Sequence, residues 1–342
     1  MYFEFYKIIF LGELISIIKG RERQCDLNVP RLIAKAEQKS VLGMWFRMMH
    51  SLLFTGCTFK EYYNLNFVKR TISNQKTFIT TGSNLKAYSK LNNKSLYHIY
   101  INKDEFNSKY SDFIARDWIM LSRNKEDVYS FFKSHNDVII KPKNGDSGKG
   151  IKIIHDCNRL TTAEIDALIS ENGEGIAEEL LYNHAELNEL NASSLNTMRI
   201  ITFRNGAQMD ILFAGIRFGA KGCEIDNISR GGRIAPIDVE TGKICGQSNT
   251  KKTVTTNNEI NDDHTGFQMP MWDELKEYLY KLTAVVPQMR YMAWDIAITN
   301  RGFVTIEGNH SSGNTVIQAH LGETQQGLRI KLNELIKQTK VS

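Results

Sequence analysis

The stretch from residue 137 to residue 155 constrains the fold more than any other part of this chain. The run Asp137–Lys143 (DVIIKPK) is rich in β-branched residues and predicts a strand, and Gly150–His155 (GIKIIH) predicts a second one. A loop with several glycines joins the two. Two short strands around a tight glycine loop form an antiparallel hairpin, so the mainly helical pattern of residues 1–95 does not continue here.

The loop of this hairpin has the composition of a phosphate-binding loop, although plain glycine-rich turns are also common. Its glycines let the backbone approach a ligand closely, and its N–H, hydroxyl and ammonium groups can donate to one oxyanion. Lys141 stands in the apolar strand that enters the loop, where a lysine either reaches solvent or meets a fixed anion. The pattern matches neither Walker A nor GxGxxG. The candidate phosphate ligands are Lys141, Lys143, Gly145, Asp146, Ser147, Gly148, Lys149 and Gly150.

Three oxygen-bearing side chains near the C-terminus form a candidate metal site. Asp295 lies in one predicted strand, and Glu307 and Asn309 follow in the next strand after a tight turn. Because Glu307 and Asn309 are two residues apart, they point to the same face of an extended chain, where Asp295 can join them. Two carboxylates and an amide oxygen suit Mg²⁺ shared with substrate phosphates. Local hydrogen bonds at a polar hairpin edge are the alternative, but the apolar flanking residues favour the metal.

Four arginines are interleaved with predicted strands and glycines between these two regions. Arg199 lies in NTMRIITF and Arg217 in AGIRFG, while Arg230 and Arg233 bracket a diglycine. Guanidinium groups on adjacent strands can bind carboxylate and phosphate oxygens in a fork. Each arginine alone would be read as a surface residue, but together they predict a cleft that binds anions and acts in catalysis.

The order of these motifs resembles the ATP-grasp superfamily, most closely its sugar-transfer-associated branch, over roughly residues 97–325. The motifs are a lysine before a glycine loop, the pair Glu178-Glu179, the NTxR sequence, an arginine–diglycine segment and a final D…ExN. The resemblance implies an α+β fold in which two α+β subdomains grip ATP, with Mg²⁺ as the metal. The glycine-proline that usually follows the last metal ligand is replaced here by SSGN.

The resemblance also implies roles for individual residues. Lys103 and Lys141 would bind the ATP phosphates, and the 145–150 loop would close over them. The hinge segment would bind adenine, with Glu186 as a ribose ligand. Its residues are Glu178, Glu179, Leu180 and Leu181. Asp295, Glu307 and Asn309 match the magnesium ligands, and Arg199 and Arg217 would hold the transferring phosphoryl group and the acyl intermediate.

We expect a helical, basic, aromatic-rich region over residues 1–95 and an ATP-grasp domain over residues 96–342. Within the latter, a lid subdomain spans about 130–180 and a catalytic subdomain about 181–342. Residues 1–100 contain 15 Lys/Arg against 6 Asp/Glu. Such a region has either a solvated basic face or a surface for an anionic partner such as a membrane. No nucleic-acid-binding motif is present.

The composition also limits where the protein works. No apolar run is long enough to cross a bilayer, the N-terminus does not resemble a secretory signal, and the five cysteines are scattered. These features predict a cytoplasmic protein. Peripheral contact with the inner face of the membrane, through the basic N-terminal region, is a second expectation.

The predicted activity is an ATP-dependent carboxylate–amine ligation through an acyl phosphate. The family resemblance implies that a sugar acid or amino sugar, free or linked to a nucleotide or lipid, is joined to an amino acid during capsule or other surface polysaccharide biosynthesis. One alternative is a kinase that uses the same grip to phosphorylate a hydroxyl group. Another is a non-catalytic nucleotide-binding module, against which the complete Asp295, Glu307 and Asn309 trio argues.

Overall fold

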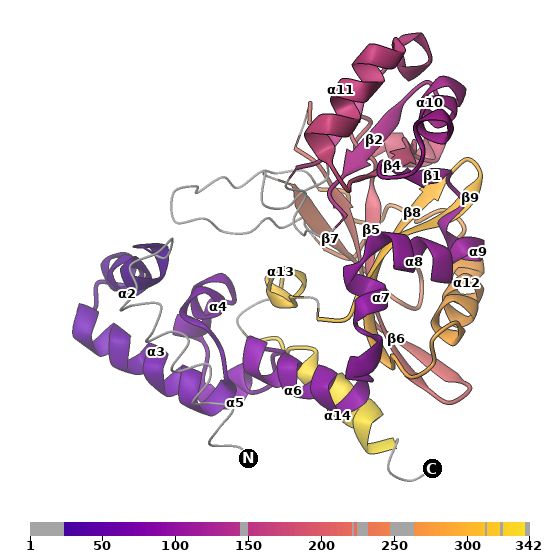
Figure 1. Ribbon diagram of the computed structural model, residues 1–342. Helices are drawn as coiled ribbons and strands as arrows, with labels where there is room; N and C mark the ends of the chain where they lie inside the picture. The colour runs from indigo at the N-terminus through magenta and orange to yellow at the C-terminus, as the bar shows by residue number, and fades with distance from the viewer. Residues whose placement is uncertain are drawn as a thin grey trace.

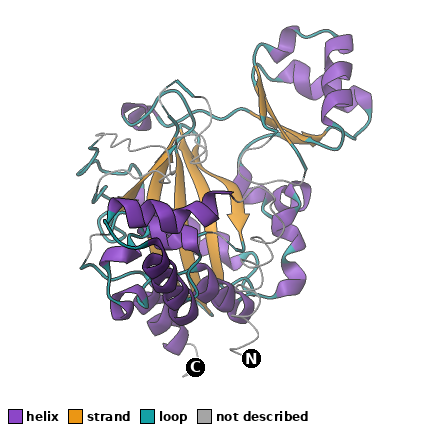
Figure 2. Cartoon of the chain, turned by 90° about the vertical axis from the view of Figure 1, so that its left-hand side faces the viewer, coloured by secondary structure: helices purple, strands orange, loops and turns teal. Residues whose placement is uncertain are grey.

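The computed structural model describes residues 24–143, 150–220, 222–223, 232–246, 263–311, 313–321 and 324–338. Within these ranges two antiparallel sheets organise the chain, one of four strands in the order β1-β4-β2-β3 and one of five in the order β7-β6-β5-β8-β9 (Figures 1 and 2). None of the described helices is long and apolar enough to cross a membrane.

Helices dominate the chain up to residue 115. Side chains cap the N-termini of three of these helices: Ser40, Thr58 and Thr80 each accept a hydrogen bond from a backbone N–H three residues later. The bounds are α2 (Gln24–Ala36), α3 (Val41–Thr55), α4 (Phe59–Asn64), η1 (Phe67–Lys69), α5 (Ile72–Gln75), α6 (Thr81–Leu91), η2 (Lys94–Leu96), α7 (His98–Ile101), α8 (Lys103–Lys109) and α9 (Ser111–Ile114).

The four-stranded sheet and two helices form a small lobe, which lies at the top of Figure 1. The hairpin predicted around the glycine loop is present, with Val138 opposite Ile154. Its apolar side chains pack on α10 and α11 around Phe132 and Ile165. The bounds are β1 (Trp118–Met120), α10 (Lys125–Ser134), β2 (Val138–Lys141), β3 (Lys152–Ile154), η3 (Cys157–Arg159), α11 (Thr162–Asn172) and β4 (Ile176–Glu179).

The five-stranded sheet separates two hydrophobic cores. One face packs on α12 through Leu275, Leu279 and Leu282, and the other packs on α6 and α14. Tyr88 of α6 stacks on Tyr291 of β8, so α6 belongs to the core of this sheet although it lies within the predicted N-terminal region. The bounds are η4 (Ala185–Glu189), β5 (Thr197–Asn205), β6 (Gln208–Phe218), β7 (Arg233–Ile237), α12 (Trp272–Ala284), β8 (Tyr291–Thr299), β9 (Gly302–Asn309), α13 (Thr315–Gln318) and α14 (Arg329–Gln338).

Candidate active site

A buried carboxylate with two arginines lies in the middle of the five-stranded sheet. Asp295 of β8 is directly opposite Arg199 of β5, whose Nε and Nη2 donate to Oδ1 and Oδ2 at 2.5 and 2.9 Å. Arg217 of β6 places its Nη2 2.9 Å from the Asp295 Oδ2 atom. Burial opposes the charge on Asp295, but the two guanidinium groups outweigh burial and hold its pKa below the ordinary value.

The other two predicted metal ligands lie beside this carboxylate. Glu307 of β9 is directly opposite Asp295, and Asn309 donates from Nδ2 to Glu307 Oε1 at 3.0 Å. Part of the Glu307 side chain is exposed, yet desolvation and the neighbouring Asp295 carboxylate raise its pKa. Two carboxylates in contact repel one another unless a proton or a cation lies between them. The structure therefore brings together hard oxygen donors that fit Mg²⁺.

A second charged network lies in the small lobe, centred on Glu178 of β4. The Glu178 side chain is buried, and it accepts hydrogen bonds from Lys141 Nζ at 2.5 Å, Arg116 Nη2 at 3.0 Å and Asn107 Nδ2 at 3.1 Å. Burial alone would raise the pKa of Glu178, but Arg116 and Lys141 lower it far below the ordinary value. Lys141 is predicted to bind phosphate, and in the structure its partner is the carboxylate of Glu178.

Arg116 connects the two sheets and was missed in the sequence analysis. Its Nη1 donates to the carbonyl oxygen of Thr305 at 2.8 Å and its Nη2 to that of Ile306 at 3.3 Å, both on β9. The same guanidinium group binds Glu178 of the small lobe, so it links the lysine network to the strand that carries Glu307. The one available sequence signal was an arginine just before a short apolar strand, which is too common to single out.

Two further predicted phosphate ligands lie at the start of α8. Lys103 is the first residue of this helix, and Lys143 Nζ lies 3.4 Å from the Asp104 carboxylate. Gly150, at the far end of the loop, has φ +74°, and a Cβ there would lie 2.9 Å from Pro142 Cγ, so this position requires glycine. Five predicted ligands of the loop lie outside the described residues: Gly145, Asp146, Ser147, Gly148 and Lys149. The predicted catalytic residue Arg230 also lies outside them.

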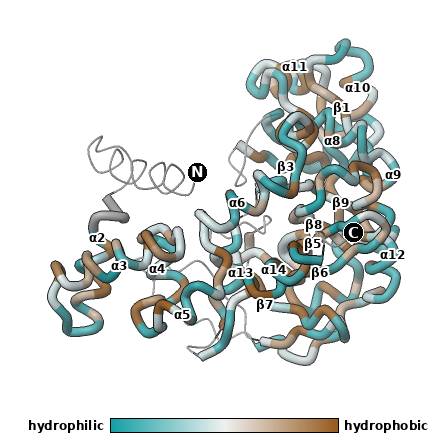
Figure 3. The backbone as a smooth tube through the Cα atoms, turned by 90° about the horizontal axis from the view of Figure 1, so that it is seen from below, coloured by the Kyte–Doolittle hydropathy of each residue, from teal (hydrophilic) through white to brown (hydrophobic). Residues whose placement is uncertain are grey.

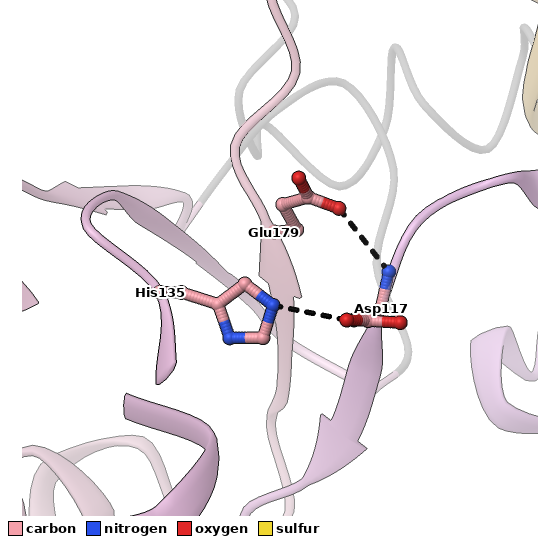
Figure 4. Close-up of side chains that lie close together, drawn as sticks. All are labelled: Asp117, His135 and Glu179. Atoms are coloured by element: carbon pink, nitrogen blue, oxygen red, sulfur yellow. Dashed lines mark hydrogen bonds and ion pairs between the residues drawn. The ribbon is translucent and has the colours of Figure 1, made fainter. Parts of the chain in front are cut away.

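Two of the predicted hinge residues, Glu178 and Glu179, point to opposite faces of β4. Glu179 points away from Lys141, and its carboxylate binds Arg301 Nη2 at 3.0 Å. The same carboxylate accepts a hydrogen bond from the Asp117 N–H at 3.5 Å, and His135 Nε2 lies 3.1 Å from Asp117 Oδ2 (Figure 4). The side chains of Asp117, His135 and Glu179 lie close enough together to offer ligand atoms to one metal ion. In the structure Glu179 binds Arg301 and the Asp117 N–H, and the group joins the start of β1 to the end of α10.

The remaining predicted residues lie away from the two charged networks. In the backbone after β4, the Leu180 N–H donates to Asp137, and the Leu181 side chain is buried. Glu186 is an exposed residue of η4 near His184. Arg233 of β7 is opposite Phe218 and stacks over its ring, on the face of the sheet that packs on α12. Because Arg217 lies on the other face, the structure does not bring Arg233 into the arginine group.

Two antiparallel sheets, one with a lysine–glutamate network and the other with a carboxylate–arginine group, are the arrangement expected of an ATP-grasp protein. The model of one family, sugar-transfer associated ATP-grasp, matches residues 73–335, and the chain belongs to this family. The family predicted from the motifs is confirmed, and the α+β ATP-grasp fold with it. The match begins earlier than the predicted residue 97 and includes α6.

Several solved structures are similar in fold. The ATP-grasp ligase PsnB, complexed with minimal precursor, Mg and ADP, is 15% identical, with 79% of this chain and 70% of that chain covered and a TM-score of 0.44. D-alanyl-alanine synthetase A from Vibrio cholerae is 12% identical, with 71% and 65% covered and a TM-score of 0.43. L-amino acid ligase from Bacillus licheniformis is 10% identical, with 75% and 54% covered and a TM-score of 0.44. No curated protein matches the chain.

Proposed function

We propose that this protein is an ATP-dependent ligase that joins a carboxylate to an amine through an acyl phosphate. One observation carries the proposal: Asp295, Glu307 and Asn309 meet Arg199 and Arg217 on one sheet, and β9 is tied by Arg116 to the Lys141 network on the other. An acidic trio beside arginines suits a metal–phosphate complex, and a lysine at the facing lobe suits its phosphates. The family supplies the reaction class.

The residues of this site divide the work of the proposed reaction. Asp295, Glu307 and Asn309 would hold Mg²⁺, which neutralises phosphate charge when bound. Lys141 would exchange Glu178 for a phosphate oxygen, and Arg116 would remain to neutralise Glu178. The substrate carboxylate oxygen attacks the γ-phosphorus and ADP leaves; the amine nitrogen then attacks the acyl carbon, loses a proton and expels phosphate. Arg199 and Arg217 would bind the oxyanion of that second step.

We infer the substrates from the family description alone. Its association with sugar transfer supports a sugar acid or an amino sugar, joined to an amino acid, in the cytoplasmic assembly of a surface polysaccharide such as a capsule. The sugar can be free or linked to a nucleotide or lipid carrier. The structure contributes the anion-binding character of the site: Arg199 and Arg217 of one sheet and Lys141 of the other suit a carboxylate substrate beside a triphosphate.

The test is a screen of ADP release from the full-length protein across sugar acids and amino acids, with and without Mg²⁺ and hydroxylamine. A ligase gives ADP that depends on Mg²⁺ and on a carboxylate, and hydroxylamine traps the acyl phosphate as a hydroxamate. If the product carries a phosphorylated hydroxyl group and no hydroxamate forms, the protein is a kinase and not a ligase. The variant Glu307→Gln should retain the fold by circular dichroism and lose ADP release by about 100-fold or more. Unchanged turnover would remove this carboxylate from the mechanism.

A further inference from the structure

Helix α3 has an exposed apolar face in addition to its buried one. Leu42, Phe46 and Leu53 are 66, 60 and 52% exposed, although they are among the largest apolar side chains of the helix. Trp45 and Phe54 are exposed as well. Figures 1 and 3 both place α3 at the edge of the molecule, far from the two sheets. The charged groups of the candidate active site therefore play no part in this surface.

The positions of these side chains around the helix exclude scattered surface residues. The exposed residues 42, 45, 46 and 53 occupy one arc about 100° wide at the 3.6-residue period, and Phe54 lies beyond one edge of it. Met49, within the same arc, is partly buried and packs against the helical core. The buried face, with Met44, Met48 and Leu52, occupies a different arc and packs into the helical core. A surface helix of a globular protein normally has one apolar stripe facing its core. A second group of exposed apolar side chains on the same helix is typical of an interaction surface.

The surroundings of the exposed face are strongly basic. Residues 28–100 contain 11 Lys/Arg and only two acidic residues, Glu37 and Glu61. Glu61 is buried and binds backbone N–H groups of Thr58 and Thr81. Lys39 precedes the start of α3, Arg47 lies on the same side of the helix as Phe54, and Lys76 Nζ lies 5.5 Å from the centre of the Phe54 ring. One cation thus lies near the start of α3, and two lie beside Phe54 at the edge of the exposed face.

We propose that this face docks on the surface of an anionic phospholipid membrane. Its aromatic and aliphatic side chains enter the boundary between headgroups and acyl chains, and the cations near Phe54 and the start of α3 bind lipid phosphates. With 15 residues, α3 is too short to span a bilayer and lies in the plane of the surface. A second copy of the chain is the less suitable occupant, because a two-fold contact through this face would bring the same cations against one another.

The helical region that carries the docked face also contacts the segment that follows the metal-ligand strand. Glu61 of α4, the helix that follows α3, accepts a hydrogen bond from Thr315 Oγ1 at 3.3 Å. Thr315 begins α13, six residues after Asn309. The docking itself does not depend on the reaction that the site performs.

Trp45 allows a direct test with the full-length protein. Of the four tryptophans, Trp272 and Trp294 are buried and Trp118 is half-buried, whereas Trp45 is exposed; residues 1–23 contain none. The probes are vesicles of phosphatidylcholine mixed with phosphatidylglycerol, and vesicles of pure phosphatidylcholine. We expect the protein to sediment with the anionic vesicles and less so at high salt. Its emission should shift to shorter wavelength and be quenched by brominated acyl chains. Trp45→Phe should remove that shift while binding persists.

Substitutions on the exposed arc complete the test. The double variant Leu42→Asp, Phe46→Asp should reduce vesicle binding by about tenfold or more, because two large apolar side chains can no longer leave water. The matched control Leu85→Asp, Ile330→Asp places the same charges at exposed apolar positions of α6 and α14 and should bind like the wild type. Circular dichroism checks that both variants fold. If either variant does not fold, the Trp45 emission measurements decide the test.

Three results would overturn the proposal. The first is no sedimentation with anionic vesicles. The second is sedimentation without any change in Trp45 emission, which would place the lipid contact elsewhere in the chain. The third is a stable dimer, or a complex with another protein, that the double variant dissociates while vesicle binding is absent; the face would then be a protein interface.

Discussion

The substitution Arg116→Met tests the link between the two sheets most directly. Arg116 neutralises Glu178 in a buried setting and donates to two carbonyl oxygens of β9. Breaking a buried ion pair by removing one partner costs about 3–5 kcal/mol. Because Lys141 stays bound to Glu178, we place this loss at about 3 kcal/mol, and the two carbonyl oxygens left without their donor together add about 1 kcal/mol. The free energy of unfolding should therefore fall by about 4 kcal/mol.

The assay is urea unfolding of the wild type, Arg116→Met, Glu178→Gln and the double variant at neutral pH. In the double variant no unpaired carboxylate is left, so Arg116→Met should cost at least about 1 kcal/mol less in the Glu178→Gln background. A second readout is pH. Since Arg116 and Lys141 lower the pKa of Glu178 in the folded protein, the charge of Glu178 contributes stability above its unfolded pKa of about 4.3. That contribution is lost as the pH falls below this value.

The difference in stability between the wild type and Arg116→Met should therefore shrink as the pH falls below about 4.3. A loss of less than about 1 kcal/mol at neutral pH, or an equal loss in both backgrounds, would refute the reasoning. Either result would mean that Glu178 reaches water or another cation when Arg116 is removed. The network would then not be the link between the two sheets that the structure indicates.

Two further predictions concern positions away from the charged networks. A Cβ at Gly327 would lie 2.6 Å from Phe78 Cα, so Gly327→Ala should lower the free energy of unfolding by about 1–3 kcal/mol. Gly313→Ala, with no atom within 4 Å of its Cβ, should change it little; equal losses by urea unfolding would contradict the packing argument. Burial raises the pKa of the Cys57 thiol to about 12, whereas Cys223 is exposed. Iodoacetamide should label Cys223 and spare Cys57 in the folded protein; a labelled Cys57 peptide, detected by mass spectrometry, would show that the helical core opens.

Local patterns carried most of what could be predicted. The hairpin at residues 137–155 was expected because β-branched runs around glycines have few other conformations, and it is present. The spacing of Glu307 and Asn309 placed both on one face of a strand, and the structure keeps them together beside Asp295. Such inferences need only the two-residue period of an extended chain and the pairing of neighbouring strands.

Other features depended on which face of a strand meets which neighbour. Glu178 and Glu179 look equivalent in the sequence, but strand alternation sends one to Lys141 and the other to Arg301. Arg233 carries the same charge as Arg217, yet its position opposite Phe218 puts it on the other side of the sheet. Contacts between residues distant in sequence decide these outcomes, and no local pattern encodes them.

The sequence by itself determined the family, the order of the phosphate- and metal-binding motifs and the basic character of the N-terminal region, because these follow from residue types at fixed spacings. Only the tertiary structure decided that Arg116 joins the two sheets and that α3 leaves one of its two apolar faces exposed. The physical reason is the same in both cases. A side chain acquires its role from the partner that packs against it, and that partner comes from a part of the chain that spacing alone cannot identify.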